Sequence, residues 1–350
     1  MMDGGPARTA AAPPPPVAAG ATRAPGGRME RPLVGAVDLG STCCRMGVAE
    51  VRPSGRYRVV ERFSRITRLG EGLGASGRLS DSAMERSLSV LLQCASAMRD
   101  RGVSRVRAVT TQATRVAGNG ADFARRVAAE TGLALEIIAP EEEARLALAG
   151  CASLLDPNRP YALVFDIGGA SSELMWVRVT PHGARLLESR SLPLGVISLT
   201  ERMSDYDAAV EEVSRALAGI DAACGIARKA RAGRVQMLGT SGTVTTLAGI
   251  HMGLPRYDRR KVDGRVVSFP AFEEATLKLR RMSLSDRARH PCVGRDRARF
   301  LMAGCAILEA LRTVWPVGQI RVADRGVREG LLRDLATPGA VTLAAEGETA

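Results

Sequence analysis

Two segments in different halves of the chain share one pattern, in which an apolar run leads into Asp-x-Gly and then into small or hydroxyl residues. They read Val-Gly-Ala-Val-Asp38-Leu-Gly40-Ser41-Thr42 and Leu-Val-Phe-Asp166-Ile-Gly168-Gly169-Ala-Ser171-Ser172-Glu173. A short apolar run fits a buried strand, and glycines fit a tight turn after it. Because the pattern occurs once in each half, we expect a duplicated α/β fold with a cleft between two related lobes.

The turns after these strands contain the residue types that bind phosphate. Backbone N–H groups of a glycine turn and the hydroxyls of Ser and Thr can approach an anion closely. A third glycine-rich segment, residues 238–243, lies between an expected strand and an expected helix, which is the context that phosphate binding requires. The candidate phosphate-binding residues of the three turns are Gly40, Ser41, Thr42, Gly168, Gly169, Ser171, Ser172, Gly239, Gly242 and Thr243.

The net charge of the chain is +12 over 350 residues, and all but three of its 49 basic residues are arginine. Two explanations fit this bias equally well: the codon usage of a GC-rich genome, and a surface that attracts polyanions such as polyphosphate, nucleotides or RNA. Aromatic residues make up only 3% of the chain. They are too few for the stacking platforms that bind single-stranded nucleic acid, so this composition disfavours a nucleic-acid partner.

Composition also indicates where the protein works. No apolar run approaches the roughly 20 residues that cross a bilayer, so we expect no membrane partner. The seven cysteines form no Cys-x-x-Cys pair, which indicates a reducing, cytoplasmic location. With only three histidines, the chain has few residues that could form a zinc site or a histidine-centred triad. The sequence leaves the oligomeric state open, including a homodimer.

The chain divides into four expected parts. Residues 1–31 are rich in Ala, Pro and Gly, and their prolines would interrupt the apolar core of a signal peptide, so we expect a disordered leader. An N-terminal lobe is expected over 32–157. A C-terminal lobe is expected over 158–337, with its last helix packing back on the first lobe. A flexible tail is expected over 338–350.

Each half begins with strands joined by hairpins and continues with alternating helices and strands. In the first half we expect strands over 34–38 and 45–51, and later a helix whose N-terminus is capped by Ser80. In the second half we expect one long helix over 206–229 and a last short strand over 319–322.

Taken in order, these motifs resemble the short, two-domain members of the exopolyphosphatase / guanosine pentaphosphate phosphohydrolase (Ppx/GppA) phosphatase family. The resemblance covers about 33–335 and implies duplicated actin-like (ASKHA) ribonuclease H-like domains with an interdomain cleft. The matching segments are Asp38-Leu-Gly-Ser41, Thr110-Thr-Gln-Ala-Thr-Arg115 followed by Asn119, Ile137-Ile-Ala-Pro-Glu-Glu-Glu143, Asp166-Ile-Gly-Gly-Ala-Ser171-Ser-Glu173, Leu194-Gly195, Gly239-Thr-Ser-Gly242-Thr and Arg328-Glu-Gly-Leu-Leu332.

The resemblance implies roles for individual residues. Glu143 would be the catalytic base that deprotonates the attacking water, and Arg115 would contact phosphate. Asp166 and Glu173 would serve Mg²⁺ and the catalytic water, with Mn²⁺ as an alternative metal. Asp38, at the end of its strand, is a third candidate metal residue. The competing role for Glu143 is stabilisation of a helix N-terminus, which its two preceding glutamates also fit.

The implied activity is release of terminal orthophosphate from inorganic polyphosphate, short chains above all, or from guanosine pentaphosphate, with a place in the stringent response. A phosphotransferase of the same superfamily and a non-catalytic sensor of guanosine tetra- or pentaphosphate are the alternatives. The chain departs from the family at Thr42 and Cys43 and at Ala170, where a third glycine is usual. Because alanine adopts positive φ only at a cost, we expect Ala170 to shift the second turn or to narrow it slightly.

Overall fold

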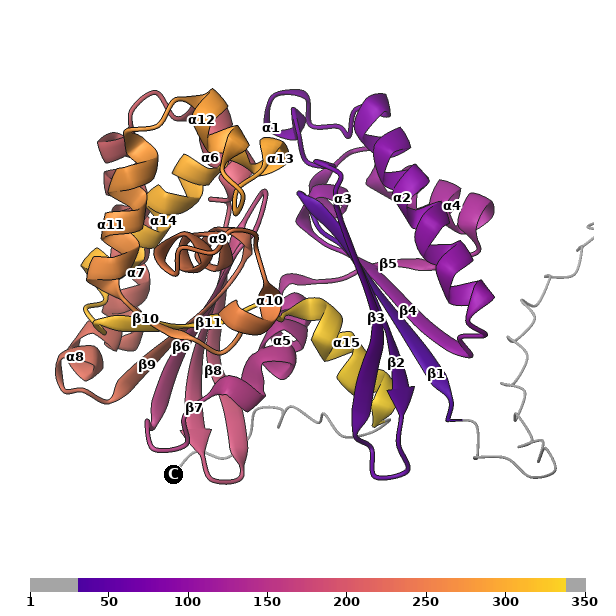
Figure 1. Ribbon diagram of the computed structural model, residues 1–350, viewed down its shortest axis with the longest axis horizontal. Helices are drawn as coiled ribbons and strands as arrows, with labels where there is room; N and C mark the ends of the chain where they lie inside the picture. Colours follow the sequence, from indigo (N-terminus) through magenta and orange to yellow (C-terminus); the bar gives the residue numbers. More distant parts are fainter. Residues whose placement is uncertain (1–30, 338–350) are drawn as a thin grey trace, which may run out of the picture. The chain divides into compact units, whose positions relative to one another are not determined.

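The computed structural model describes residues 31–337. The expected leader, apart from its last residue, and the expected tail lie outside the described residues. From Pro32 onward the described residues belong to one compact unit. Within it the backbone forms two β-sheets with helices on their faces (Figure 1).

The first sheet has the strand order β3-β2-β1-β4-β5. Its first three strands are antiparallel neighbours, whereas β4 runs parallel to β1 and β5 runs parallel to β4. The strands are β1 (Leu33–Leu39), β2 (Cys43–Val51), β3 (Tyr57–Ile66), β4 (Arg105–Thr110) and β5 (Leu135–Ile137).

The second sheet repeats this plan with one additional edge strand, in the order β10-β11-β9-β6-β7-β8. Strands β6, β7 and β8 correspond to β1, β2 and β3, and β9 and β11 continue the sheet in parallel as β4 and β5 do. The matching order and directions confirm the duplicated α/β fold. The strands are β6 (Tyr161–Ile167), β7 (Ser172–Thr180), β8 (Gly183–Leu192), β9 (Val235–Thr240), β10 (Val266–Ser268) and β11 (Gln319–Ala323).

Helices follow the strands in both halves (Figure 1). In the first half the α-helices are α1 (Leu73–Ser76), α2 (Asp81–Asp100), α3 (Gln112–Val116), α4 (Gly120–Thr131) and α5 (Pro140–Cys151). In the second half they are α6 (Val196–Arg202), α7 (Tyr206–Cys224), α8 (Ile226–Arg231), α9 (Gly242–His251), α10 (Arg259–Val262), α11 (Phe269–Arg280), α12 (Leu284–Arg289), α13 (Arg295–Ala298), α14 (Leu301–Val314) and α15 (Val327–Ala336).

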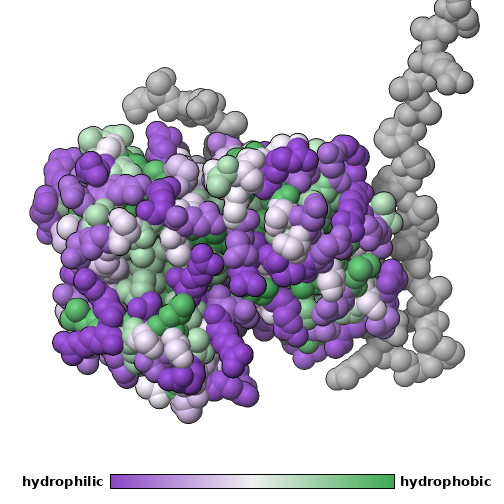
Figure 2. All heavy atoms as spheres, turned by 90° about the horizontal axis from the view of Figure 1, so that it is seen from above, coloured by the Kyte–Doolittle hydropathy of each residue, from purple (hydrophilic) through white to green (hydrophobic). Residues whose placement is uncertain are grey.

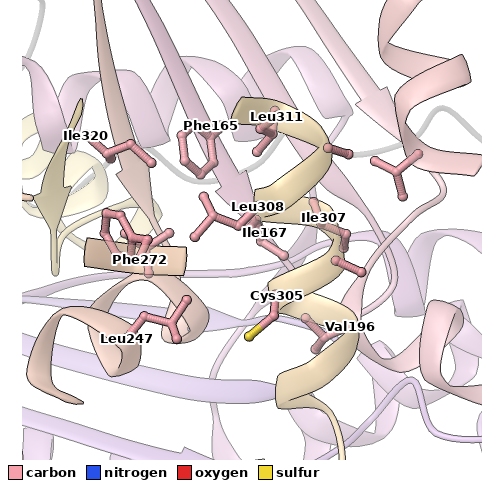
Figure 3. Packing of buried hydrophobic residues seen from close by; sticks show 14 of the residues in the cluster. Phe165, Ile167, Val196, Leu247, Phe272, Cys305, Ile307, Leu308, Leu311 and Ile320 are labelled. Atoms are coloured by element: carbon pink, nitrogen blue, oxygen red, sulfur yellow. The ribbon is translucent and has the colours of Figure 1, made fainter. Parts of the chain in front are cut away.

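The apolar side chains of the two central strands alternate between different cores, as the twofold period of a strand requires. On β1, Val37 and Leu39 pack with α2 and α4, whereas Val34 and Ala36 face a middle cluster that also contains residues of α5 and α15. On β6 the alternate residues likewise divide between this middle cluster and the core of the second half. Figure 3 shows Phe165 in that second core, near Leu308 and Leu311 of α14.

Helices α5 and α15 connect the two sheets. Helix α5 contacts β7 and β8 of the second sheet, whereas α15 contacts β1 and β2 of the first, and the two helices pack against each other. Their backbones touch: a Cβ on Gly330 would lie 2.1 Å from the carbonyl oxygen of Leu146, and one on Gly150 would lie 2.1 Å from that of Gly326. Only glycine permits this approach.

Several local expectations can be checked directly. Ser80 caps α2, with its side chain accepting a hydrogen bond from the Ala83 N–H. The single helix expected over 206–229 is wrong, because Gly225 adopts φ 60° and separates α7 from α8. The three-residue strand β10 was not expected, since a run that short carries no recognisable period.

No helix within residues 31–337 combines the length and apolar character needed to cross a bilayer. Hydrophilic residues cover most of the face shown in Figure 2.

Candidate active site

The first turn joins β1 to β2. The Gly40 N–H donates a hydrogen bond to the Cys43 carbonyl at 2.9 Å, which closes the turn around Ser41 and Thr42. Asp38, at the end of β1, and Ser41 are both buried. The buried Thr42 Oγ1 has no hydrogen-bond partner among the described residues, so it can donate to a bound oxyanion.

The second turn, between β6 and β7, lies directly against the first. The Gly168 N–H donates to the Ser171 carbonyl at 2.9 Å. A Cβ on Gly169 would lie 2.2 Å from Thr42 Oγ1 and 2.9 Å from the Ser41 Cβ, so the contact between the turns requires glycine for steric reasons. Ala170 does not have positive φ, so it does not incur the cost that this conformation imposes on alanine.

The third turn leads into α9. The Ser241 side chain accepts a hydrogen bond from the Val244 N–H and caps the helix, whose N-terminus favours an anion. Ser241 has φ 147° and ψ 166°, a region that favours glycine. The Arg297 guanidinium lies next to this N-terminus, with its Cζ 3.6 Å from the position of a Cβ on Gly242.

The three turns surround a cavity of about 110 Å³. Its walls include apolar side chains such as Val196, Phe300 and Leu301, which limit access of water. The predicted site residues that line it are Asp38, Gly40, Ser41, Thr42, Glu143, Asp166, Gly168, Gly169, Ser171, Glu173, Gly242 and Thr243.

Three predicted site residues do not line this cavity. Ser172 Oγ donates a hydrogen bond to the Leu194 carbonyl at 2.5 Å. Gly239 packs against Phe165, whose ring would come within 2.5 Å of a Cβ there. Arg115 Nη1 donates to the Ile138 carbonyl at 2.6 Å and lies 3.6 Å from Glu143 Oε2. Arg115 therefore neighbours the expected base and not the cavity.

Glu143 lies in the first turn of α5, which Pro140 starts at its N-terminal end. The residue is only 9% exposed, and its Oε2 has no hydrogen-bond partner among the described residues. Burial, and then the charge of Glu173, raise the pKa of Glu143 well above its usual value, while Arg115 opposes this shift. A buried carboxylate with an unused oxygen and a raised pKa is suited to accept a proton from water.

Three further carboxylates line the cavity. Burial raises the pKa of Asp166 to about 7, with Arg45 opposing the shift and Glu173 and Asp38 adding to it. Burial also raises the pKa of Asp38 and of Glu173. Glu173 Oε1 accepts hydrogen bonds from the Ser171 and Ser191 hydroxyls at 2.5 and 3.0 Å, which fix its orientation.

The donor set fits a hard cation that keeps several waters. No three acidic, thiol or imidazole side chains between residues 31 and 337 converge as a ready-made metal site. Mg²⁺ commonly binds through one or two carboxylates together with substrate phosphates and waters. Burial is the largest cause of the raised pKa values of Asp38, Asp166 and Glu173, and a divalent cation beside these carboxyl groups would favour their ionised forms.

Two arginines at this site were missed by the sequence reasoning. Arg45 lies opposite Asp38 in the β1–β2 ladder, 3.9 Å from its carboxylate, and Arg297 lies beside α9; both line the cavity. The hairpin register could have identified Arg45, because it pairs the residue with the predicted Asp38. No comparable signal marks Arg297, because arginine is abundant throughout the chain.

The chain is similar to known proteins over most of its length. The model of the Ppx/GppA phosphatase family matches residues 48–337. The crystal structure of the Aquifex aeolicus member of that family is 28% identical, covers 89% of this chain and 99% of its own, and has a TM-score of 0.71. An exopolyphosphatase-like protein is 26% identical over 87% of this chain and 98% of its own, with a TM-score of 0.77.

An exopolyphosphatase from Cytophaga hutchinsonii, 21% identical over 89% of this chain and 100% of its own, has the same fold with a TM-score of 0.80. The expected duplicated actin-like (ASKHA) architecture is thereby confirmed. The family match covers most of the chain and includes Glu143 and the second and third glycine-rich turns. The chain belongs to the Ppx/GppA phosphatase family.

Proposed function

We propose that the protein hydrolyses the terminal phosphoanhydride bond of inorganic polyphosphate, or of guanosine pentaphosphate, and releases orthophosphate. The observation that carries this proposal is the buried Glu143, whose Oε2 has no partner among the described residues and which lines a cavity formed by three glycine-rich turns. Phosphoanhydride hydrolysis depends on positioning and charge neutralisation, with one group to accept the proton of water.

In the proposed reaction the turn amides and the Thr42 hydroxyl hold the terminal phosphoryl group. Arg45 and Arg297 balance the charge of its oxygens, as the planar guanidinium allows. Glu143 accepts a proton from water as the new P–O bond forms, and the bond to the bridging oxygen breaks on the opposite side. The remaining substrate leaves with one phosphate fewer.

One or two of the carboxylates of Asp38, Asp166 and Glu173 would hold Mg²⁺, with Mn²⁺ as the alternative, together with substrate phosphates and waters, and the cation would supply positive charge for the departing phosphate. Ser171 and Ser191 keep the Glu173 carboxylate oriented toward that role. We also propose a cytoplasmic location, in line with the seven cysteines, all of which are free thiols.

The decisive experiment measures orthophosphate release, with and without Mg²⁺, from tripolyphosphate, long-chain polyphosphate and guanosine pentaphosphate in parallel. We expect release from at least one of them, and a loss of about 10²–10⁴-fold in Glu143→Gln. The matched control is Glu141→Gln, an exposed carboxylate on the same helix turn.

Two results would contradict the proposal. Tight binding of guanosine pentaphosphate without turnover, unchanged by Glu143→Gln, would identify a sensor. Transfer of phosphate only when an acceptor is present would identify a phosphotransferase.

A further inference from the structure

A second, larger cavity adjoins the first. Its volume is about 470 Å³, against about 110 Å³ for the cavity of the three turns. Arg45, Gly242 and Arg297 line both cavities, so a ligand held by these residues could extend from one into the other. Residues 62–66 of β3 line the second cavity on the side of the first sheet.

This second cavity, here named the basic annex, is strongly positive. Its described lining includes three carboxylates, Asp296, Asp324 and Glu329. The arginines that line it are Arg45, Arg62, Arg65, Arg259, Arg297, Arg325 and Arg328.

Contacts within the protein already pair some of these arginines with carboxylates. Asp324 accepts a hydrogen bond from the Tyr257 hydroxyl at 2.7 Å and lies 3.3 Å from Arg259. Glu329 accepts from Arg328 at 2.6 Å. Asp324 and Glu329 are therefore engaged by protein donors and are poorly placed to receive the N–H groups of a nucleobase.

Two arginines on β3 remain available to bind a ligand. Neither Arg62 nor Arg65 pairs with a carboxylate within the described residues. Arg65 lies over the Phe63 ring, 4.4 Å from its centroid, and donates to the Ser64 carbonyl. Burial, and then the positive charges of Arg259 and Arg328, lower the pKa of Arg62. An anion at this position would relieve that repulsion.

We propose that the basic annex holds the phosphates that follow the terminal one in a linear polyphosphate, and that Arg62 and Arg65 set the preference for chain length. The inference rests on the proposed function. Three positions apart on a strand, the two side chains leave opposite faces of β3, and both line the annex, so each can contact a phosphate of a chain that extends out of the first cavity. Arg65 covers the ring of Phe63, so this ring is not free to stack on a nucleobase.

The test compares Arg62→Ser/Arg65→Ser with Arg52→Ser/Arg56→Ser. The control removes the same charge from exposed residues at the β2–β3 hairpin, none of which lines either cavity. The measured quantity is the ratio of kcat/KM for long-chain polyphosphate to kcat/KM for tripolyphosphate. We expect the annex variant to lower this ratio about tenfold, the effect of losing two partly exposed charge-assisted contacts.

A ratio within about twofold of wild type, or an equal fall in the control, would overturn the annex role. Absence of orthophosphate release by wild type would instead defeat the proposed function. The annex could then still be tested by measuring the binding of long-chain polyphosphate by calorimetry. Weaker binding in Arg62→Ser/Arg65→Ser alone would support the role of the annex. Equal binding in the annex variant and the control variant would overturn it.

Discussion

Arg115 Nη1 lies 3.6 Å from Glu143 Oε2, while the same nitrogen donates a 2.6 Å hydrogen bond to the Ile138 carbonyl. The guanidinium is thus held beside the carboxylate without forming a hydrogen bond to it. This arrangement favours the ionised form of Glu143 and leaves Oε2 available to water. We infer that Arg115 acts mainly as a positioning residue for the base.

Replacing Arg115 should therefore change the pH dependence of catalysis. Glu143 must be ionised to accept a proton, so activity rises with pH through its raised pKa. Arg115→Gln removes a charge that lowers this pKa, and the acid limb of the kcat profile should move up by about one pH unit. Arg115→Lys keeps the positive charge, so its acid limb should lie between those of Arg115→Gln and the wild type. An unchanged acid limb with a raised KM would indicate direct phosphate contact instead.

Mg²⁺ should stabilise the free protein more at alkaline than at acidic pH. The pKa of Asp166 is raised in the folded state, to about 7, so its contribution to stability is present at low pH and is lost as pH rises through that value. The cation compensates only the ionised carboxylate. Thermal unfolding with and without Mg²⁺ should show a larger Tm increase at about pH 8 than at about pH 5.

NaCl of equal ionic strength controls for screening in that experiment. Asp166→Asn should reduce the Tm increase at alkaline pH. An increase of the same size at both pH values would contradict the carboxylate site.

Gly169→Ala should damage catalysis by separating the first two turns. Its Cβ would lie 2.2 Å from Thr42 Oγ1, and relief of such a clash costs about 1–3 kcal/mol of folding free energy. Urea unfolding and phosphate release together measure both effects. Gly219→Ala is the matched control, because this position of α7 is exposed and its Cβ would meet nothing within 4 Å, and it should stabilise by about 0.5–1 kcal/mol. Wild-type activity in Gly169→Ala would show that the contact is dispensable.

Ser241→Gly should stabilise the protein. The backbone conformation of Ser241 costs a non-glycine residue about 1–3 kcal/mol, whereas replacing a capping serine by glycine costs only a few tenths. After the added chain entropy, a net gain of about 1 kcal/mol in the free energy of unfolding is expected. Ser283→Gly, at a cap with ordinary φ of −64°, should destabilise slightly. A loss of stability in both variants would show that the strain at Ser241 is absent.

The hairpins, the three glycine-rich turns and the position of Glu143 could be predicted because each depends on local sequence. Asp38 and Asp166 follow apolar runs, and Pro140 marks the start of the helix that carries Glu143. The glycines of the turns were predicted for a partly wrong reason. Gly169 is required by the approach of Thr42 from the other half of the chain, which no local pattern reveals.

The remaining features depend on distant parts of the chain. Arg297 comes to Gly242 only through the packing of the second half, and the abundance of arginine hides it in the sequence. The hydrogen bond of Ser191 to Glu173 depends on the register between β7 and β8. Single polar contacts of this kind have no periodic signature.

Because α5 packs on the second sheet and α15 packs on the first, cutting the chain between its halves would separate each helix from the sheet that it covers. A fragment ending at residue 157 would keep α5 without β7 and β8, and would leave β1 and β2 without α15. Each fragment would then expose part of the middle apolar cluster to water. We therefore expect each half to be insoluble when it is expressed alone. When the two halves are expressed together, they should associate and form one soluble domain.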